Sequence, residues 1–195
     1  MRFSSLKLRG AALIGIEPLP DERGFFARTA CVREFQAHGL RGEFVQSSIS
    51  SNARRGTLRG MHFQWPPSRE DKLVRCLRGA IFDVLLDLRP GEPSFLRHEA
   101  VELTAAGRDA VYVPAGVAHG FQTLADDTEV LYQMTDFHAP GLAAGVRWND
   151  PAFGISWPSG LGLVIAARDA AYPDFDPEAF RAELQRHGTA PVAAS

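Results

Sequence analysis

Two histidines and a tyrosine are the residues of this sequence that could transfer protons. His62 ends the run Arg59-Gly60-Met61-His62, His119 follows a Pro-Ala-Gly turn, and Tyr132 lies within an apolar run. A neutral imidazole can take a proton near neutral pH, and a phenol that points into a cavity can return one. Each residue taken alone is more often a hydrogen-bonded packing residue, so these three are candidates for an acid–base site and not proof of one.

Basic residues gather in the first half of the chain and could bind an anion. An arginine offers a planar fork for two phosphate oxygens, and a lysine offers a point charge. The commoner explanation of such a group is a solvated charged face. The group comprises Arg23, Arg54, Arg55, Arg59, Lys72 and Arg75.

Asp83 interrupts an apolar run that is typical of a β-strand. Side chains alternate between the two faces of a strand, so Asp83 shares its face with Ile81, Leu85 and Asp87. Two interpretations remain open. Asp83 is either a surface carboxylate on a half-exposed strand or a buried carboxylate that orients a histidine.

Short apolar runs separated by Gly and Pro turns predict an all-β fold, either a sandwich or a barrel. Two helices are expected, at about 31–38 and 176–185, the second with Asp176 as N-cap. One domain is expected over residues 1–187, with a frayed tail at 188–195. The clearest strands are predicted at 74–77, 81–88, 111–113 and 129–134.

Composition excludes several classes of protein. The 195 residues carry 21 Lys and Arg against 23 Asp and Glu, a net charge of −2, which disfavours a nucleic-acid-coating protein. No apolar run approaches the roughly 20 residues needed to span a bilayer, and the N-terminus lacks the apolar stretch of a secretory signal. Two cysteines are too few for a disulfide framework. A cytoplasmic protein without a membrane or nucleic-acid partner is expected, and no Gly-rich turn supports a dinucleotide or P-loop site.

Taken together, the motifs of this chain resemble the dTDP-4-dehydrorhamnose 3,5-epimerase family over about residues 1–175. The resemblance is in unbroken order, which makes it more specific than any single motif. It is carried by Asp21-Glu22-Arg23-Gly24-Phe25-Phe26, Gly56 through Gln64, Lys72-Leu73-Val74-Arg75-Cys76, Ile81-Phe82-Asp83-Val84, Pro114 through Phe121, Leu131-Tyr132-Gln133, Trp148-Asn149-Asp150-Pro151, Ile155-Ser156-Trp157-Pro158 and Arg168-Asp169.

The resemblance implies a cupin-type jelly-roll barrel of two antiparallel sheets with a few short peripheral helices, a homodimer, and no cofactor. Many cupins hold a metal through a His-x-His pair, a Glu and a second His. Here His119 fits the second half of that pattern, but His62 is followed by Phe63 and Gln64. That ligand set is poor for a divalent ion, so a metal-free site is expected and a metal-dependent dioxygenase is the alternative.

The family's reaction inverts carbons 3 and 5 of a dTDP-linked 4-keto-6-deoxyhexose, a precursor of dTDP-L-rhamnose. By resemblance, His62 is the base, Asp169 the carboxylate that pairs with it, and Tyr132 the acid. Lys72 would stabilise the enolate oxygen. The substrate-binding positions are Arg23, Gln46, Arg59, His119, His138 and Arg168, and Asp83 is expected to orient His119.

Four positions depart from the family pattern. His138 stands where family members usually have a Tyr that is thought to steer the second epimerisation, and Arg28 stands where many have Glu. Ala143 or a neighbour replaces a common Glu, and Arg168 replaces a common Lys. These departures leave two alternatives open, a monofunctional 3- or 5-epimerase on a related nucleotide sugar and a non-catalytic binding module.

Overall fold

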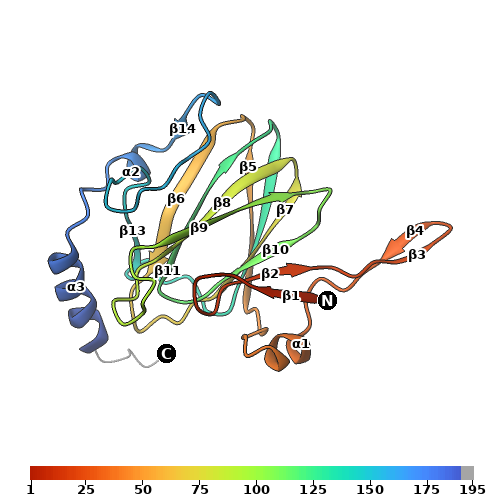
Figure 1. Ribbon diagram of the computed structural model, residues 1–195, viewed down its shortest axis with the longest axis horizontal. Helices are drawn as coiled ribbons and strands as arrows, with labels where there is room; N and C mark the ends of the chain where they lie inside the picture. The colour runs from red at the N-terminus through yellow and green to blue at the C-terminus, as the bar shows by residue number, and fades with distance from the viewer. Residues whose placement is uncertain (190–195) are drawn as a thin grey trace.

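The computed structural model describes residues 1–189, which form two facing sheets and three short helices (Figure 1). The first sheet is antiparallel, in the order β1 (Arg2–Ser5), β2 (Ala12–Gly15), β10 (Ala110–Val113), β7 (Lys72–Arg78), β12 (Thr128–Met134) and β5 (Gln46–Asn52). The second has the order β13 (Ala143–Gly145), β6 (Thr57–Gln64), β11 (Val117–Thr123), β8 (Ala80–Asp87) and β9 (His98–Thr104), with β14 (Val164–Ile165) parallel to β6.

The main core lies between the two sheets. Val74 and Val130 of the first sheet meet Ile81, Leu85 and Phe121 of the second, and all five are fully buried. Two antiparallel sheets closed over one core form the cupin-type jelly roll, so the predicted fold class is confirmed. The four strands predicted from apolar runs are confirmed as β7, β8, β10 and β12.

The helices lie outside the barrel. The helix α1 (Val32–Ala37) packs Phe35 against the first sheet, and α2 (Ala167–Ala170) is a single turn beside β6. The helix α3 (Pro177–Thr189) places Phe180 and Leu184 on the outer face of the second sheet. None of the helices in residues 1–189 is long and apolar enough to cross a membrane.

The C-terminal helix predicted at 176–185 has the correct start, but the observed helix continues further than predicted. The Asp176 side chain accepts hydrogen bonds from the N–H groups of Glu178 and Ala179, as an N-cap residue does. The helix continues past Gln185 to Thr189, because contacts across its last turns extend it: His187 pairs with Glu183 and stacks on Trp65. Gly188 and Thr189 are therefore the last residues of the helix, the frayed tail expected at 188–195 stays a prediction, and residues 190–195 lie outside the described residues.

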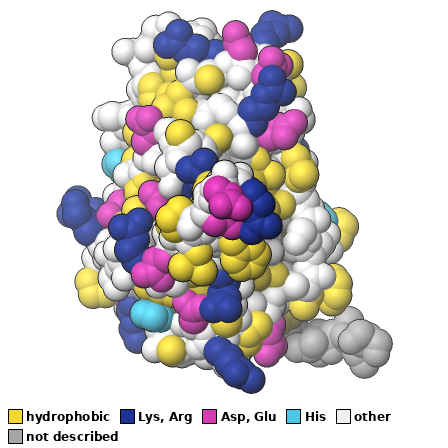
Figure 2. Space-filling model, turned by 90° about the vertical axis from the view of Figure 1, so that its right-hand side faces the viewer, with side chains coloured by type: hydrophobic (Ala, Val, Ile, Leu, Met, Phe, Trp, Pro, Cys, Tyr) yellow, Lys and Arg dark blue, Asp and Glu magenta, His cyan; other side chains and the backbone are white. Residues whose placement is uncertain are grey.

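A hairpin of β3 (Leu19–Asp21) and β4 (Gly24–Phe26) projects from the barrel on the side away from α2 and α3 (Figure 1). Figure 2 looks onto this side of the molecule, where hydrophobic side chains lie between basic and acidic ones. Apolar side chains on the hairpin are unusually exposed, with Leu19 at 68% and Phe26 at 74%. Such exposure is typical of a surface that meets another protein.

A bulge in β6 determines which of its side chains face the inside of the barrel. His119 pairs with His62, and Phe121 pairs with Arg59, so two steps along β11 match three steps along β6. The extra residue reverses the alternation of faces, and Arg59 and His62 consequently line the same cavity. Gly60, with φ of +140°, lies in this bulge, and a Cβ there would sit 2.6 Å from the Gly120 Cα.

Gly60→Ala should therefore destabilise the fold by about 3 kcal/mol or more, because the new methyl group meets backbone that cannot move aside. Gly141→Ala is the control, since nothing lies within 4 Å of a Cβ at that position. Urea unfolding measures both. Equal midpoints for the two variants would show that the close approach of β6 and β11 does not constrain the fold.

Candidate active site

A cavity of about 260 Å³ opens between the two sheets at the mouth of the barrel. Five strands contribute to its lining, which is why residues far apart in the sequence meet there. Chemically reactive side chains from both sheets face it. The lining residues are Ser48, Ile49, Ser50, Arg59, His62, Lys72, His119 and Tyr132.

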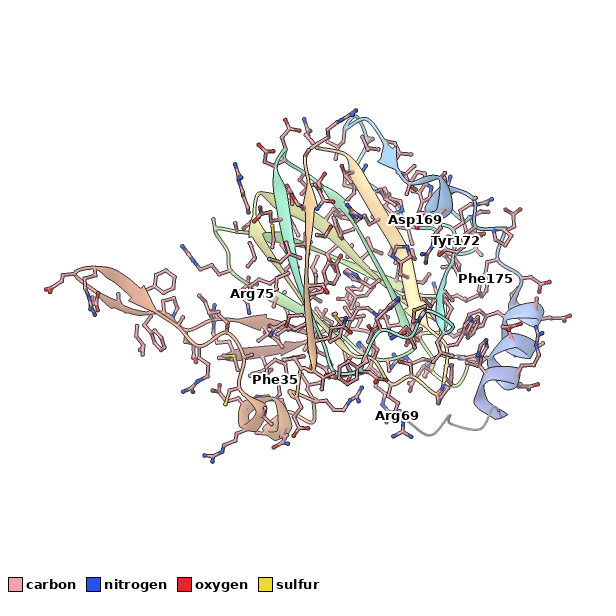
Figure 3. The ribbon with its side chains drawn as sticks, turned by 180° about the vertical axis from the view of Figure 1, so that it is seen from behind. Phe35, Arg69, Arg75, Asp169, Tyr172 and Phe175 are labelled. Carbon is pink, nitrogen blue, oxygen red and sulfur yellow. The ribbon has the colours of Figure 1, made fainter. Side chains whose placement is uncertain are left out.

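Asp169 joins His62 to the bulge of β6. Its Oδ1 lies 2.8 Å from His62 Nε2, and its Oδ2 accepts a hydrogen bond of 3.2 Å from the Gly60 N–H. The short helix α2 carries Asp169, which is buried, against the outside of β6, and Tyr172 follows one turn later (Figure 3). The carboxylate accepts the Nε2 proton, so the other ring nitrogen, Nδ1, carries the lone pair.

The environment of His62 lowers its pKa. Burial at the cavity wall is the main cause, and the positive charge of Arg168 and the ring of His119 act in the same direction. The hydrogen bond and charge of Asp169 oppose this shift without overcoming it. The imidazole is therefore neutral at pH 7 and available as a base.

A second histidine–carboxylate pair lies deeper in the barrel. His119 Nε2 is 2.8 Å from Asp83 Oδ2, and both side chains are buried. Asp83 is thus the buried partner of a histidine and not a surface carboxylate. Its other oxygen, Oδ1, has no hydrogen-bond partner among the described residues.

Tyr132 stands across the cavity from His62, on the facing sheet. Its ring meets His119 edge-on at 5.8 Å between centroids. Burial raises the pKa of the phenol, and the charge of Asp83 raises it further, against a smaller opposing effect of Arg59. The hydroxyl therefore keeps its proton at neutral pH and can act as a donor.

Each of the two cations of the cavity has a partner that sequence reasoning missed. Lys72 Nζ lies 2.5 Å from Glu70 Oε2, with both side chains largely buried. Arg59 Nε donates a hydrogen bond of 2.8 Å to Asn52 Oδ1. Glu70 lies in the loop just before β7, where strand periodicity does not apply, so the sequence carried no clear signal for this pair.

Other predicted positions lie outside this cavity lining. Gln46 Oε1 accepts a hydrogen bond from the His138 N–H at 2.9 Å, so these two come together at the start of β5. Arg168 is exposed beside Asp169, 3.4 Å from the Tyr172 hydroxyl. Arg23 is on the projecting hairpin, 83% exposed and paired with Asp21.

The expected anion-binding group is only partly assembled. Arg59 and Lys72 line the cavity, but Arg75 turns to the other face of its strand, because side chains alternate there. Its guanidinium donates to the backbone oxygens of Arg108 and Thr29. The remaining members, Arg54 and Arg55, lie in the turn between β5 and β6.

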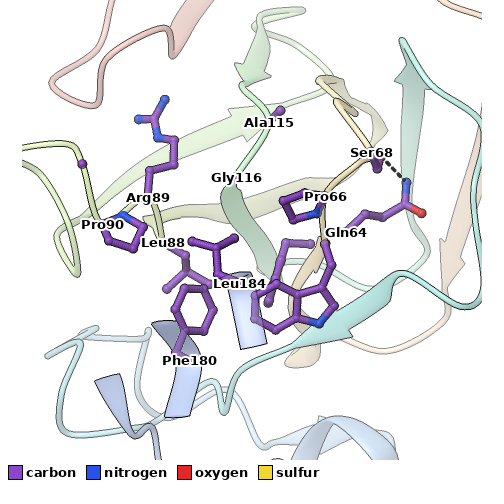
Figure 4. A pocket seen from close by; sticks show the side chains of 13 residues that line it. Gln64, Pro66, Ser68, Leu88, Arg89, Pro90, Ala115, Gly116, Phe180 and Leu184 are labelled. Atoms are coloured by element: carbon purple, nitrogen blue, oxygen red, sulfur yellow. Dashed lines mark hydrogen bonds between the residues drawn. The ribbon is translucent and has the colours of Figure 1, made fainter. Parts of the chain in front are cut away.

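A second cavity of about 260 Å³ lies outside the barrel, under α3 (Figure 4). Apolar side chains such as Leu88, Phe180 and Leu184 form most of its wall. The charged residue there, Arg89, is engaged with Asp87 at 2.7 Å. The proton-transferring groups are in the barrel cavity, so that cavity is the candidate active site.

A metal-dependent cupin needs several His, Cys, Asp or Glu side chains close enough together to bind one metal ion. Within residues 1–189, no group of three or more His, Cys, Asp or Glu lies close enough to hold a metal ion. Gln64, where a second ligand would stand, uses its amide on Ser68 and on the Ala139 N–H. A metal-free site stays a prediction.

A cupin-type jelly roll that gathers imidazole, phenol and ammonium groups around one cavity has the side chains of an acid–base enzyme. The family model for dTDP-4-dehydrorhamnose 3,5-epimerase matches residues 5–177. The chain therefore belongs to the dTDP-4-dehydrorhamnose 3,5-epimerase family.

Individual relatives agree with this assignment. A dTDP-4-dehydrorhamnose 3,5-epimerase of Sinorhizobium fredii is 38% identical over 173 residues, which is 89% of each chain. A Bacillus anthracis dTDP-4-dehydrorhamnose 3,5-epimerase solved with TDP and PPi bound has a TM-score of 0.85 at 33% identity, covering 89% of this chain and 99% of that one. ChmJ, a 3'-monoepimerase from Streptomyces bikiniensis in complex with dTDP-quinovose, has a TM-score of 0.84 at 32% identity, covering 93% and 91%.

The geometry around His62 predicts its titration in the free protein. Because its pKa is lowered, the ring should lose its proton below the ordinary value of 6.5. NMR of the histidine resonances from about pH 4.5 to 8, a range of roughly two pH units around the ordinary value, would measure the pKa of His62. The His62→Gln variant identifies which resonance belongs to His62. Asp169→Asn should lower the pKa further, since it removes the carboxylate that favours the charged ring. A higher pKa in that variant would show that the Asp169 carboxylate does not favour the charged ring.

Proposed function

We propose that this protein epimerises a dTDP-linked 4-keto-6-deoxyhexose at carbons 3 and 5, as its family membership suggests. Both carbons are α to the ketone, so their protons are acidic enough to be removed by a positioned base. Epimerisation by proton exchange needs a base, an acid and a group that stabilises the enolate. It requires no redox cofactor.

The base in this proposal is His62. Its Nε2 is engaged with Asp169 at 2.8 Å, and its Nδ1 has no hydrogen bond to any described residue, so Nδ1 takes the substrate proton. Asp169 fixes that tautomer and stabilises the imidazolium that forms. Arg168 lies beside this pair, where its charge favours the neutral imidazole before reaction and can meet substrate phosphate.

The acid is Tyr132, and Lys72 stabilises the enolate. Tyr132 belongs to β12 and His62 to β6, on facing sheets, so a sugar between them meets the base on one face and the acid on the other. That opposition is the observation that carries the proposal, because inversion requires removal and return of the proton on opposite faces. A cation near the ketone oxygen lowers the cost of the enolate. His119, held by Asp83, lines the same wall.

A monofunctional 3- or 5-epimerase is the second candidate. His138 stands in the usual place of a tyrosine, and its backbone N–H donates to Gln46 at the start of β5. A smaller ring gives less stacking area to the sugar after the first inversion. ChmJ, which this chain resembles closely, is itself a 3'-monoepimerase.

We also propose a homodimer in which the hairpin of one copy serves the cavity of the other. Arg23 is the expected diphosphate contact, yet it lies on a hairpin that projects away from its own barrel (Figure 1). The exposed Leu19 and Phe26 of that hairpin need an apolar partner. At the hairpin base, Arg108 stacks over Phe25 at 4.7 Å and sets the angle at which the hairpin leaves the barrel. The cytoplasm remains the expected compartment.

Turnover of dTDP-4-dehydro-6-deoxyglucose in heavy water tests the reaction. Two deuterium atoms per product are expected, one for each carbon that exchanges its proton with solvent. His62→Gln should abolish uptake, and Tyr132→Phe should slow product formation by about 100-fold or more while dTDP binding stays within about twofold. Mass spectrometry counts the deuterium and calorimetry measures the binding.

The other outcomes are equally decisive. One deuterium atom would contradict inversion at both carbons and support the monofunctional alternative, with His138→Tyr as the next variant. No uptake together with tight dTDP binding would contradict catalysis altogether and support a binding module.

Mixing two inactive variants tests the homodimer. Arg23→Ala and His62→Gln chains, unfolded and refolded together, should recover about a quarter of wild-type activity, because one site in each mixed dimer regains both residues. Each variant refolded alone is the control. A mixture as inactive as its components would show that Arg23 does not act on the partner's cavity.

A further inference from the structure

The two cations of the cavity are held by partners of different charge. Arg59 is oriented by the neutral amide of Asn52, whereas Lys72 is paired with the carboxylate of Glu70. A carboxylate cancels the charge that a neighbouring cation presents to a ligand, and an amide does not. The cavity therefore contains one uncompensated cation and one compensated cation.

Asn52 is built into the sheet as a fixed acceptor. It is 2% exposed, and its Nδ2 donates to the backbone oxygens of Ser50 and Thr128 at 3.2 and 3.1 Å. These two bonds leave Oδ1 to receive Arg59 Nε at 2.8 Å. The Nη atoms of Arg59 make no hydrogen bond to any described residue, so both can bind an anion in a bidentate manner.

Glu70 is to Lys72 what Asn52 is to Arg59, a buried acceptor that holds the cation. It is 9% exposed, and its Oε2 contacts Lys72 Nζ at 2.5 Å inside the barrel wall. Its neighbour Asp71, which also precedes β7, has a different set of partners: Arg41, Tyr112 and the Ala115 N–H donate to its carboxylate. Those contacts fix the start of β7 and keep Glu70 directed at Lys72.

Asn52 and Lys72 lie beside opposite ends of β12 in the first sheet. Along β12, Asn52 is registered with Thr128 and Lys72 with Met134. Six residues of extended strand correspond to about 20 Å. The end with Arg59 and the end with Lys72 can therefore bind different halves of a substrate that has one charged half and one neutral half.

We infer that Asn52 and Glu70 are positioning residues that give the cavity its polarity. Asn52 presents Arg59 with its full charge to the diphosphate of the substrate. Glu70 offsets the charge of Lys72, so that Lys72 does not trap a phosphate but still has N–H groups that donate to the ketone oxygen and to the enolate oxygen that forms from it. The inference rests on the proposed function and extends it, because it explains why the sugar, and not the diphosphate, occupies the end that holds Lys72.

Asn52→Asp tests the first half at nearly constant side-chain shape; because it also removes the two bonds that Nδ2 donates to backbone oxygens, urea unfolding checks that the variant is folded. The new carboxylate keeps the hydrogen bond to Arg59 but cancels its charge, so dTDP should bind about tenfold more weakly, with the difference shrinking as salt is raised. Ser51→Asp is the matched control: it adds the same charge one residue away on the exposed face of β5 and should change binding by less than about twofold. Equal affinities for the two variants would overturn the role of Asn52.

Asn52→Ala gives an independent measure if the aspartate variant does not fold. It removes the acceptor without adding charge, so the KM of the nucleotide sugar should rise about threefold or more with a smaller change in kcat. An unchanged KM would overturn the role of Asn52 equally.

Glu70→Gln tests the second half. With dTDP already bound at Arg59, inorganic pyrophosphate should bind the variant at Lys72 about tenfold more tightly than it binds the wild type, as measured by calorimetry. Glu70→Asp, which keeps the charge, should resemble the wild type. No gain in pyrophosphate binding would overturn the role of Glu70. The dTDP and pyrophosphate readouts of Asn52→Asp and Glu70→Gln are binding constants, so a wild-type protein that binds dTDP without turning over substrate would count against the proposed function and leave these two tests intact.

Discussion

Asp169 accepts two hydrogen bonds from β6, one from the backbone N–H of Gly60 and one from the ring of His62. Through these bonds, one carboxylate holds both the shape of the strand and the tautomer of the histidine. The bulge that it supports turns Arg59 and His62 toward the same cavity, and without that bulge their side chains would face opposite sides of the sheet. The arrangement of anion-binding and proton-accepting groups therefore depends on a contact from outside the barrel.

The remaining chemistry comes from the facing sheet. β12 supplies Tyr132 and β7 supplies Lys72, and their register is fixed by the ladder that joins these two strands to β5. Burial has opposite consequences for the two groups that we propose as base and acid. It lowers the pKa of His62, so the ring is a base, and it raises the pKa of Tyr132, so the phenol stays an acid. One cavity between two sheets thus shifts the two pKa values in opposite directions.

Positive charge is also unevenly distributed inside the cavity. Asn52 leaves the charge of Arg59 available, and Glu70 offsets that of Lys72. The hairpin adds a third element, because its arginine and its exposed aromatic side chains lie away from the barrel that carries them. The catalytic groups are thus provided within one chain, and the nucleotide-binding surface is completed only where two copies meet, in the arrangement we propose.

The sequence by itself determined the fold class, the family and four of the central strands, because alternating apolar residues and Gly/Pro turns are local signals. It also contained the cap at Asp176, since capping is a contact between near neighbours. It could not show that Asp83 is buried, that Arg75 faces away from the site, or that Arg59 and His62 share a face. Those outcomes depend on strand register, on a bulge and on which elements cover each sheet. Contacts between residues distant in sequence decide all three, so only the tertiary structure resolves them.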